Sequence, residues 1–295
     1  MTKSLVIGAS GLIGGHLFNT LSNSGQETFA TYHSHPISSG SPLDIRVATD
    51  LESLFNKINP DMVYLPGALP NVDYCEKNPK ESYEINVSGV QNVVNAVNQI
   101  GAKIIFFSSD YIFDGKSGPY KETDPANPIS EYGRQKLAAE QYITLHSKNY
   151  LIVRTTVVYG WEWQGKNFVY RLIKSLQEGI YVKIPIDQIG SPTYANNLAK
   201  ITVDLASSPV HGIINIAGSV LINRYEFSVA TARVFNLDER LIQPVKTEIL
   251  NQPAKRPLSA GLIVEKVLGI SSIPVIGYLE GLNTMAMDKT SQPDL

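Results

Sequence analysis

A glycine-rich turn near the N-terminus constrains this chain more than any other feature. The segment Gly8-Ala9-Ser10-Gly11-Leu12-Ile13-Gly14 follows an apolar run at residues 5–7 and opens a helical pattern at residues 12–22. Between a strand and a helix, the first glycine permits a tight turn, the second lets the backbone approach a pyrophosphate, and the third allows close helix–strand packing. The N–H groups at the helix N-terminus then favour phosphate. This glycine turn (residues 8–14) predicts a dinucleotide-binding sheet.

Short apolar runs alternate with helical patterns through the first 160 residues. The runs are rich in β-branched and aromatic residues, and they lie at residues 5–7, 28–32, 62–65, 103–107 and 150–153. Apolar spacing and capping signals predict helices at residues 12–22, 50–58, 79–100 and 131–146, the last of them capped by Ser130. This order is typical of the α/β class and predicts a doubly wound, Rossmann-like parallel sheet with right-handed crossovers.

The second half of the chain has a less regular pattern. We expect helices at residues 167–177 and 224–234, a strand at 213–216, and loops beside the site at 35–42 and 115–128. The expected organisation is a dinucleotide-binding domain over residues 1–160. A smaller C-terminal substrate-binding lobe, whose chain returns to the main sheet, follows over residues 161–295.

Composition and charge exclude several other classes of protein. The formal net charge of −2 gives no reason to expect nucleic acid or an anionic membrane as a partner. No apolar run approaches the length of about 18 residues that a membrane span needs. Cys75 is the only cysteine, which excludes an internal disulfide and a cysteine-rich metal site. We therefore expect a cytoplasmic protein without a bound metal; a homodimer is compatible with the sequence, which does not fix the oligomeric state.

The end of the second predicted strand bears on which dinucleotide binds. NAD-specific sites usually place a carboxylate there to bind the ribose 2′-hydroxyl, but this chain has Tyr32 and His33. These side chains tolerate a 2′-phosphate, which favours NADPH with NADH as the alternative, unless they are ordinary loop residues. Asp44 and Ile45 end the next apolar piece and are expected near the adenine. The expected cofactor-binding residues are Gly8, Ser10, Gly11, Leu12, Ile13, Gly14, Tyr32, His33, Asp44, Ile45, Pro66, Gly67, Ala68, Ser108, Tyr132 and Lys136.

A second motif, Tyr132-Gly133-Arg134-Gln135-Lys136, indicates proton transfer. Tyr132 and Lys136 share one face of a predicted helix, and a neighbouring ammonium is expected to lower the pKa of a tyrosine. Such a pair can exchange a proton with a substrate oxygen while hydride moves to or from a nicotinamide. Ser108 and Ser109 follow a predicted strand, and ligands bind at the carboxyl ends of strands in open α/β sheets.

With these motifs in order, the chain resembles the extended short-chain dehydrogenase/reductase family, and within it the dTDP-4-dehydrorhamnose reductases. The resemblance covers roughly residues 3–270. Besides the two motifs, it rests on the segments Ser109-Asp110-Tyr111-Ile112-Phe113-Asp114-Gly115, Pro119-Tyr120, Glu122, Arg154-Thr155-Thr156, Tyr159-Gly160, Asn167-Phe168, Asp187-Gln188-Ile189-Gly190-Ser191-Pro192-Thr193-Tyr194 and Arg256-Pro257.

The resemblance implies a catalytic trio and a reaction. The trio is Ser109, Tyr132 and Lys136, with NADPH as hydride donor and a place in dTDP-rhamnose biosynthesis. Ser109, Asp110, Tyr132, Val157 and Trp161 are the expected substrate residues. Val157 stands where the family commonly has a tryptophan that covers the deoxysugar ring. Trp161 or Trp163 is therefore expected to supply an apolar platform, unless these residues serve lobe packing.

These implications lead to one reaction hypothesis with two alternatives. The leading hypothesis is NADPH-dependent reduction of a nucleotide-linked 4-keto-6-deoxysugar. The first alternative is a non-catalytic dinucleotide-binding subunit, resembling the regulatory β subunit of methionine adenosyltransferase. The second is a nucleotide-sugar epimerase of the same fold. The intact trio favours an enzyme, and Tyr111 after Asp110 disfavours a dehydratase, which needs an acid/base pair beside the serine.

Overall fold

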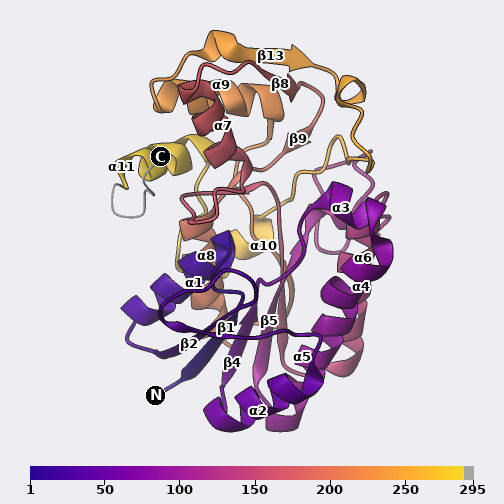
Figure 1. The fold of residues 1–295 in the computed structure, drawn as a ribbon, viewed down its shortest axis with the longest axis vertical. Coiled ribbons are helices and arrows are strands. Elements are labelled where there is room, and N and C mark those ends of the chain that lie inside the picture. Colours follow the sequence, from indigo (N-terminus) through magenta and orange to yellow (C-terminus); the bar gives the residue numbers. More distant parts are fainter. Residues whose placement is uncertain (289–295) are drawn as a thin grey trace.

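The computed structural model, which describes residues 1–288, is built around a seven-stranded parallel sheet (Figure 1). The strand order is β11-β6-β5-β4-β1-β2-β3. The strands are β1 (Lys3–Ile7), β2 (Glu27–Tyr32), β3 (Gly40–Pro42), β4 (Met62–Leu65), β5 (Lys103–Ser109), β6 (Tyr150–Thr155) and β11 (Gly212–Asn215). The order reverses between β1 and β4, and at such a switch point the carboxyl ends of the strands leave a crevice for a ligand.

Helices cover both faces of the sheet, as the alternating pattern predicted. One buried apolar cluster joins the sheet to α1 (Leu12–Asn23) and α8 (Ala195–Ala206). A second cluster joins the opposite face to α2 (Ala48–Ile58), α5 (Gly89–Ile100) and α6 (Glu131–His146). The doubly wound α/β fold is therefore confirmed.

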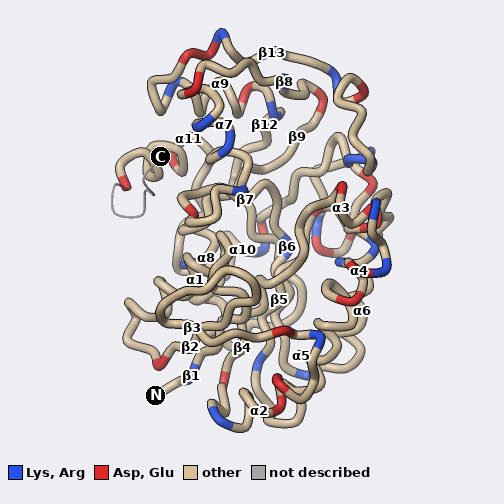
Figure 2. The backbone as a smooth tube through the Cα atoms, viewed as in Figure 1, with Lys and Arg blue, Asp and Glu red and all other residues tan. Residues whose placement is uncertain are grey.

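Most of the remaining elements of the second half gather above the carboxyl ends of the sheet strands (Figure 1), and Figure 2 shows the same arrangement with the charged residues coloured. Three two-stranded sheets lie there, formed by β7 with β10, β9 with β12, and β8 with β13. These strands are β7 (Val158–Tyr159), β8 (Val182–Pro185), β9 (Ile189–Gly190), β10 (Thr193–Tyr194), β12 (Ile222–Asn223) and β13 (Ile242–Val245). The helices of this region are α7 (Phe168–Gln177), α9 (Arg224–Val234) and α11 (Tyr278–Met287), whereas α10 (Glu265–Leu268) packs against β11 of the main sheet. The end of the expected lobe, residues 289–295, lies outside the described residues.

Several local predictions needed correction. Residues 40–42 of an expected loop form β3, because their backbone pairs with β2 at Ala30–Tyr32 and this pairing overrides low strand propensity. The helix expected at 79–100 has those bounds, but it contains an unpredicted π-helical turn at Glu84–Ser88 between α4 (Pro79–Tyr83) and α5. Neither α3 (Val72–Lys77) nor α8 was expected. By contrast, Ser130 caps α6 as predicted by accepting the N–H of Gly133.

Candidate active site

The glycine turn has the geometry that its sequence predicted. Gly8 has a φ of +89°, a conformation that L side chains rarely adopt. A Cβ at Gly14 would lie 2.2 Å from the carbonyl oxygen of Gly8, so α1 could not pack this close to the turn with a side chain there. Gly11 caps α1, and Leu12 and Ile13 form its first turn. The glycine turn at residues 8–14, also called the glycine cradle below, therefore leaves backbone N–H groups exposed to a phosphate at the end of β1.

Replacing Gly14 with alanine should destabilise the protein and weaken dinucleotide binding. The new Cβ would overlap backbone rather than a flexible side chain, and relief requires α1 to shift by an amount expected to cost about 1–3 kcal/mol or more. The neighbouring Gly15→Ala is the matched control, because its Cβ would meet the oxygen of Ala9 at an ordinary 3.5 Å. Urea denaturation and dinucleotide titration of both variants measure the free energy of unfolding and the affinity. If Gly14→Ala and Gly15→Ala lose equal amounts of both, the prediction is wrong.

The end of β2 carries a charge cluster that the local sequence did not reveal. His33 follows β2, and its Nε2 lies 3.6 Å from the carboxylate of Asp44. Arg46 holds the same carboxylate through a guanidinium contact of 2.6 Å and keeps the pKa of Asp44 near 2. The local sequence has no carboxylate at the end of β2, but tertiary structure brings Asp44 there with a paired arginine. The spacing Asp44-x-Arg46 was the available signal.

The other expected cofactor residues line the switch point. Pro66, Gly67 and Ala68 follow β4, and the N–H of Gly67 donates to the oxygen of Ile7 at 3.1 Å. Ser108 near the end of β5 is buried, and its hydroxyl has no hydrogen-bond partner among the described residues. An unpaired buried hydroxyl on the same edge of the sheet as the glycine turn fits a bound polar group such as a dinucleotide.

Three further residues of the expected cofactor set differ in their surroundings. The carbonyl of Ser10 accepts a hydrogen bond from Gln164 at 2.7 Å, which ties the segment after β7 to the glycine turn. Ile45 is buried in the apolar cluster under α2 and α5. Tyr32, at the end of β2, is partly exposed.

Tertiary structure brings the expected catalytic trio together at the carboxyl end of β5. Ser109 ends β5, while Tyr132 and Lys136 lie on the first turns of α6. The ammonium of Lys136 lies 5.9 Å from the centre of the Tyr132 ring and donates to the oxygen of Phe107 at 2.8 Å. All three side chains are buried.

The acid–base properties of the trio differ from the expectation. Burial raises the pKa of Tyr132 above its ordinary value, and the nearby Asp110 charge acts in the same direction. The predicted lowering of the pKa by Lys136 is therefore corrected, because desolvation of a phenolate outweighs the effect of the ammonium. Burial lowers the pKa of Lys136 to about 8. A protonated phenol at neutral pH is suited to donating a proton.

Asp110 organises the hydroxyl groups next to the trio. Its two carboxylate oxygens accept hydrogen bonds from Ser109 at 3.0 Å and from Thr156 at 2.6 Å. Burial raises the pKa of Asp110 to about 6, although both hydroxyl contacts oppose that rise. Above that pH the carboxylate fixes the direction of the Ser109 hydroxyl, which must turn from Asp110 to reach a substrate oxygen.

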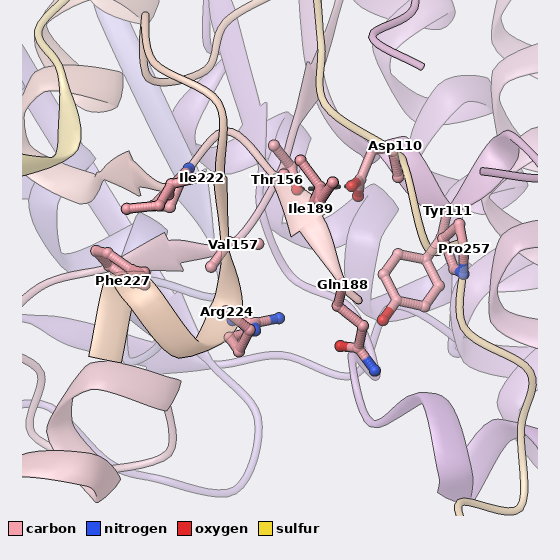
Figure 3. A pocket seen from close by; sticks show the side chains of 13 residues that line it. Asp110, Tyr111, Thr156, Val157, Gln188, Ile189, Ile222, Arg224, Phe227 and Pro257 are labelled. Carbon is pink, nitrogen blue, oxygen red and sulfur yellow. Dashed lines mark hydrogen bonds between the residues drawn. The ribbon is translucent and has the colours of Figure 1, made fainter. Parts of the chain in front are cut away.

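A cavity opens beside Asp110, between the end of β6 and the elements above the sheet (Figure 3). Val157 lines it with a φ of +44°, a strained value for a β-branched residue of the kind that collects at functional sites. Ile189, Ile222 and Phe227 complete its apolar side. Tyr111, Gln188, Arg224 and Pro257 also line it and were not among the expected site residues.

The expected platform at Trp161 is corrected. Trp161 is buried in an apolar cluster above the sheet, and its indole N–H donates to the oxygen of Met285 at 2.8 Å. The ring is therefore used in lobe packing, the alternative that the sequence left open. Trp163 is 86% exposed and does not line the cavity. Beside Val157, Ile189 and Ile222 provide the apolar surface instead.

Within residues 1–288, no three histidine, cysteine, aspartate or glutamate side chains are placed to hold a metal ion. No helix in this part of the chain is long and apolar enough to cross a membrane.

Comparison with known proteins places this site in a family. The model of the RmlD substrate binding domain matches residues 2–291. The spore coat polysaccharide biosynthesis protein SpsK of Bacillus subtilis (strain 168) is 34% identical over 100% of both chains. The dTDP-4-dehydrorhamnose reductase of Aggregatibacter actinomycetemcomitans is 29% identical, covering 90% of this chain and 92% of its own.

A solved structure agrees in fold over nearly the whole chain. The dTDP-4-dehydrorhamnose reductase of Bacillus anthracis, in complex with NADP, superposes with a TM-score of 0.91 at 27% identity and covers 98% of this chain and 100% of its own. The family resemblance carried by the two motifs is confirmed. This chain belongs to the RmlD substrate binding domain family, the family of the dTDP-4-dehydrorhamnose reductases among the extended short-chain dehydrogenases/reductases.

Proposed function

We propose that this protein reduces a nucleotide-linked 4-keto-6-deoxysugar with NADPH, in the manner of a dTDP-4-dehydrorhamnose reductase acting in dTDP-rhamnose biosynthesis. The observation that carries the proposal is the convergence of Ser109, Tyr132 and Lys136 at the carboxyl end of β5, on the same edge of the sheet as the glycine turn. The relatives named reductases point the same way. The expected substrate contacts are Ser109, Asp110, Tyr132 and Val157.

The chain's own groups account for the proton transfer. The glycine turn at residues 8–14 would hold NADPH, which would supply the hydride for the keto carbon. The Tyr132 hydroxyl donates its proton to the oxygen that gains charge, and the phenolate left behind is stabilised by the Lys136 ammonium. Ser109 orients the carbonyl through its hydroxyl, while Asp110 retains its bond from Thr156 at 2.6 Å. Burial of these groups excludes water and strengthens each interaction.

The charge cluster after β2 supports NADPH over NADH. Arg46 can bind a 2′-phosphate and already neutralises Asp44, the one carboxylate near His33 that would repel it. Arg46→Ala should weaken NADPH binding about 10-fold or more, with little effect on NADH. Arg240→Ala is the matched control, since Arg240 forms the same contact two residues from Asp238 on an exposed surface. Fluorescence titration of each variant with NADPH and with NADH measures the two affinities. An equal loss of affinity for both dinucleotides would reject the assignment of Arg46 to the 2′-phosphate.

One assay separates the proposal from its alternatives. NADPH absorbance is followed with a panel of TDP- and UDP-linked 4-keto-6-deoxysugars, and we expect stoichiometric NADPH oxidation with at least one of them. An epimerase would convert a sugar without net NADPH consumption. A non-catalytic subunit would bind NADPH and convert none. Either outcome would replace the proposed reaction.

A further inference from the structure

The cavity beside Asp110 contains a positive charge that the proposed reaction steps do not use. Arg224 begins α9, and its backbone N–H is fixed by the oxygen of Gln188 at 2.9 Å. Figure 3 shows its guanidinium below Val157, pointing across the cavity toward Gln188 and the Tyr111 hydroxyl. The guanidinium also lies over the Phe168 ring, with its carbon 4.5 Å from the ring centre. Arg224 is therefore held in place at the cavity wall.

The guanidinium of Arg224 forms no ion pair among the described residues, although the carboxylate of Asp110 is close enough to act on its charge. The ion pairs of residues 1–288 do not include Arg224, and the nearby carboxylate of Asp110 accepts from Ser109 and Thr156 instead. Arg256 is paired with Asp73 at 2.8 Å. Burial lowers the pKa of Arg224, and the charges of Arg171 and Arg256 act in the same direction, while Tyr111 and Asp110 act against it. Such like-charge crowding is unfavourable unless an anion shares the space.

Arg171 strengthens this pattern from the neighbouring helix. It lies on α7, which packs against α9, and it is exposed without an ion pair in the described part of the chain. Arg224 lines the cavity and Arg171 lies close enough to act on its charge, whereas the only carboxylate that lines the cavity, Asp110, lies at the catalytic end. The end of the cavity near α9 is therefore positively charged, and the end near β5 is negatively charged.

We propose that Arg224, assisted by Arg171, binds the diphosphate of the nucleotide-linked substrate and so orients its sugar toward Asp110. This inference rests on the proposed substrate class. A guanidinium matches phosphate oxygens with a planar pair of N–H donors, and its charge is permanent. The carboxylate of Asp110 repels phosphate but accepts sugar hydroxyls. A diphosphate at the Asp110 end would leave both arginines unpaired, so only one orientation satisfies both ends of the cavity.

Binding of TDP and UDP, measured by calorimetry against thymidine and uridine, tests the site without any turnover. In the full-length protein, Arg224→Met should weaken binding of the better nucleoside diphosphate about 10- to 100-fold, because a charge-assisted contact is lost. NADPH affinity should not change. Arg224→Lys should restore part of the affinity. Arg233→Met on the same helix is the control, since that exposed arginine pairs with Glu239 outside the cavity.

The outcomes separate this inference from the proposed reaction. If Arg224→Met binds nucleoside diphosphate as the wild type does, or if the wild type binds neither TDP nor UDP, the diphosphate site is wrong even where a keto sugar is reduced. If diphosphate binding depends on Arg224 but no keto sugar is reduced, the site stands and the reaction fails. If Arg224→Met does not fold, two other measurements test the proposal: the TDP affinity of Arg224→Lys and the salt dependence of the wild-type TDP affinity. Affinity that is unaffected by both the lysine substitution and salt would overturn the proposal.

Discussion

Tyr132→Phe should lower the turnover number about 10²–10⁴-fold while NADPH binds nearly as tightly as before. The substitution removes the one hydroxyl placed to protonate the product oxygen, and it leaves the glycine cradle untouched. The ring itself packs at the end of β5, with its centre 5.7 Å from that of Tyr111, so phenylalanine preserves the packing. Steady-state kinetics and cofactor titration on one preparation separate the two effects.

Tyr142→Phe provides the matched control on the same helix. Its hydroxyl donates to Asn95 at 3.0 Å on the exposed side of α6, away from the cavity. We expect this variant to retain the wild-type rate. If Tyr132→Phe keeps more than half of the wild-type turnover, Tyr132 is not the proton donor and another acid must be sought.

Lys136→Met should reduce turnover about 10²–10³-fold, because the ammonium that stabilises the developing phenolate is lost. The same substitution should change how stability depends on pH. Burial lowers the pKa of Lys136 to about 8, so the folded protein holds this proton less tightly than the unfolded chain does. Burying the charged lysine therefore costs up to about 3 kcal/mol at and below that pH, at about 1.4 kcal/mol per pKa unit.

The sign of this effect can be measured directly. From pH 8 to 10.5 the folded-state lysine becomes neutral while the unfolded-state lysine stays charged, so the wild type gains stability from this group as pH rises. The difference in unfolding free energy between Lys136→Met and wild type should therefore shrink across that range. Urea denaturation at several pH values tests it, with exposed Lys148→Met as the control. A difference that stays constant with pH would contradict the buried-charge argument.

Wild-type turnover should also decline as pH rises past about 8, since the neutral amine no longer stabilises the phenolate. Because the pKa of Tyr132 is raised, the phenol itself stays protonated over this range and does not explain the decline. The pH profile of turnover therefore reports Lys136.

The sequence alone determined the features that depend on local geometry. The glycine turn, the alternation of strands and helices, and the shared helix face of Tyr132 and Lys136 follow from backbone conformation and residue spacing, which act within a few residues. For the same reason the Ser130 cap and the bounds of α6 agree with the structure.

Tertiary structure decided the properties that depend on distant neighbours. The sequence could not show that Asp44 and Arg46 reach His33, that Trp161 is buried against Met285, or that Arg224 faces Asp110 across a cavity. Desolvation likewise set the pKa of Tyr132 against the direction that its lysine neighbour predicted. The burial of a side chain, and its distance from charges elsewhere in the sequence, are set only when separate elements pack together. The spacing of residues along the chain therefore does not predict them.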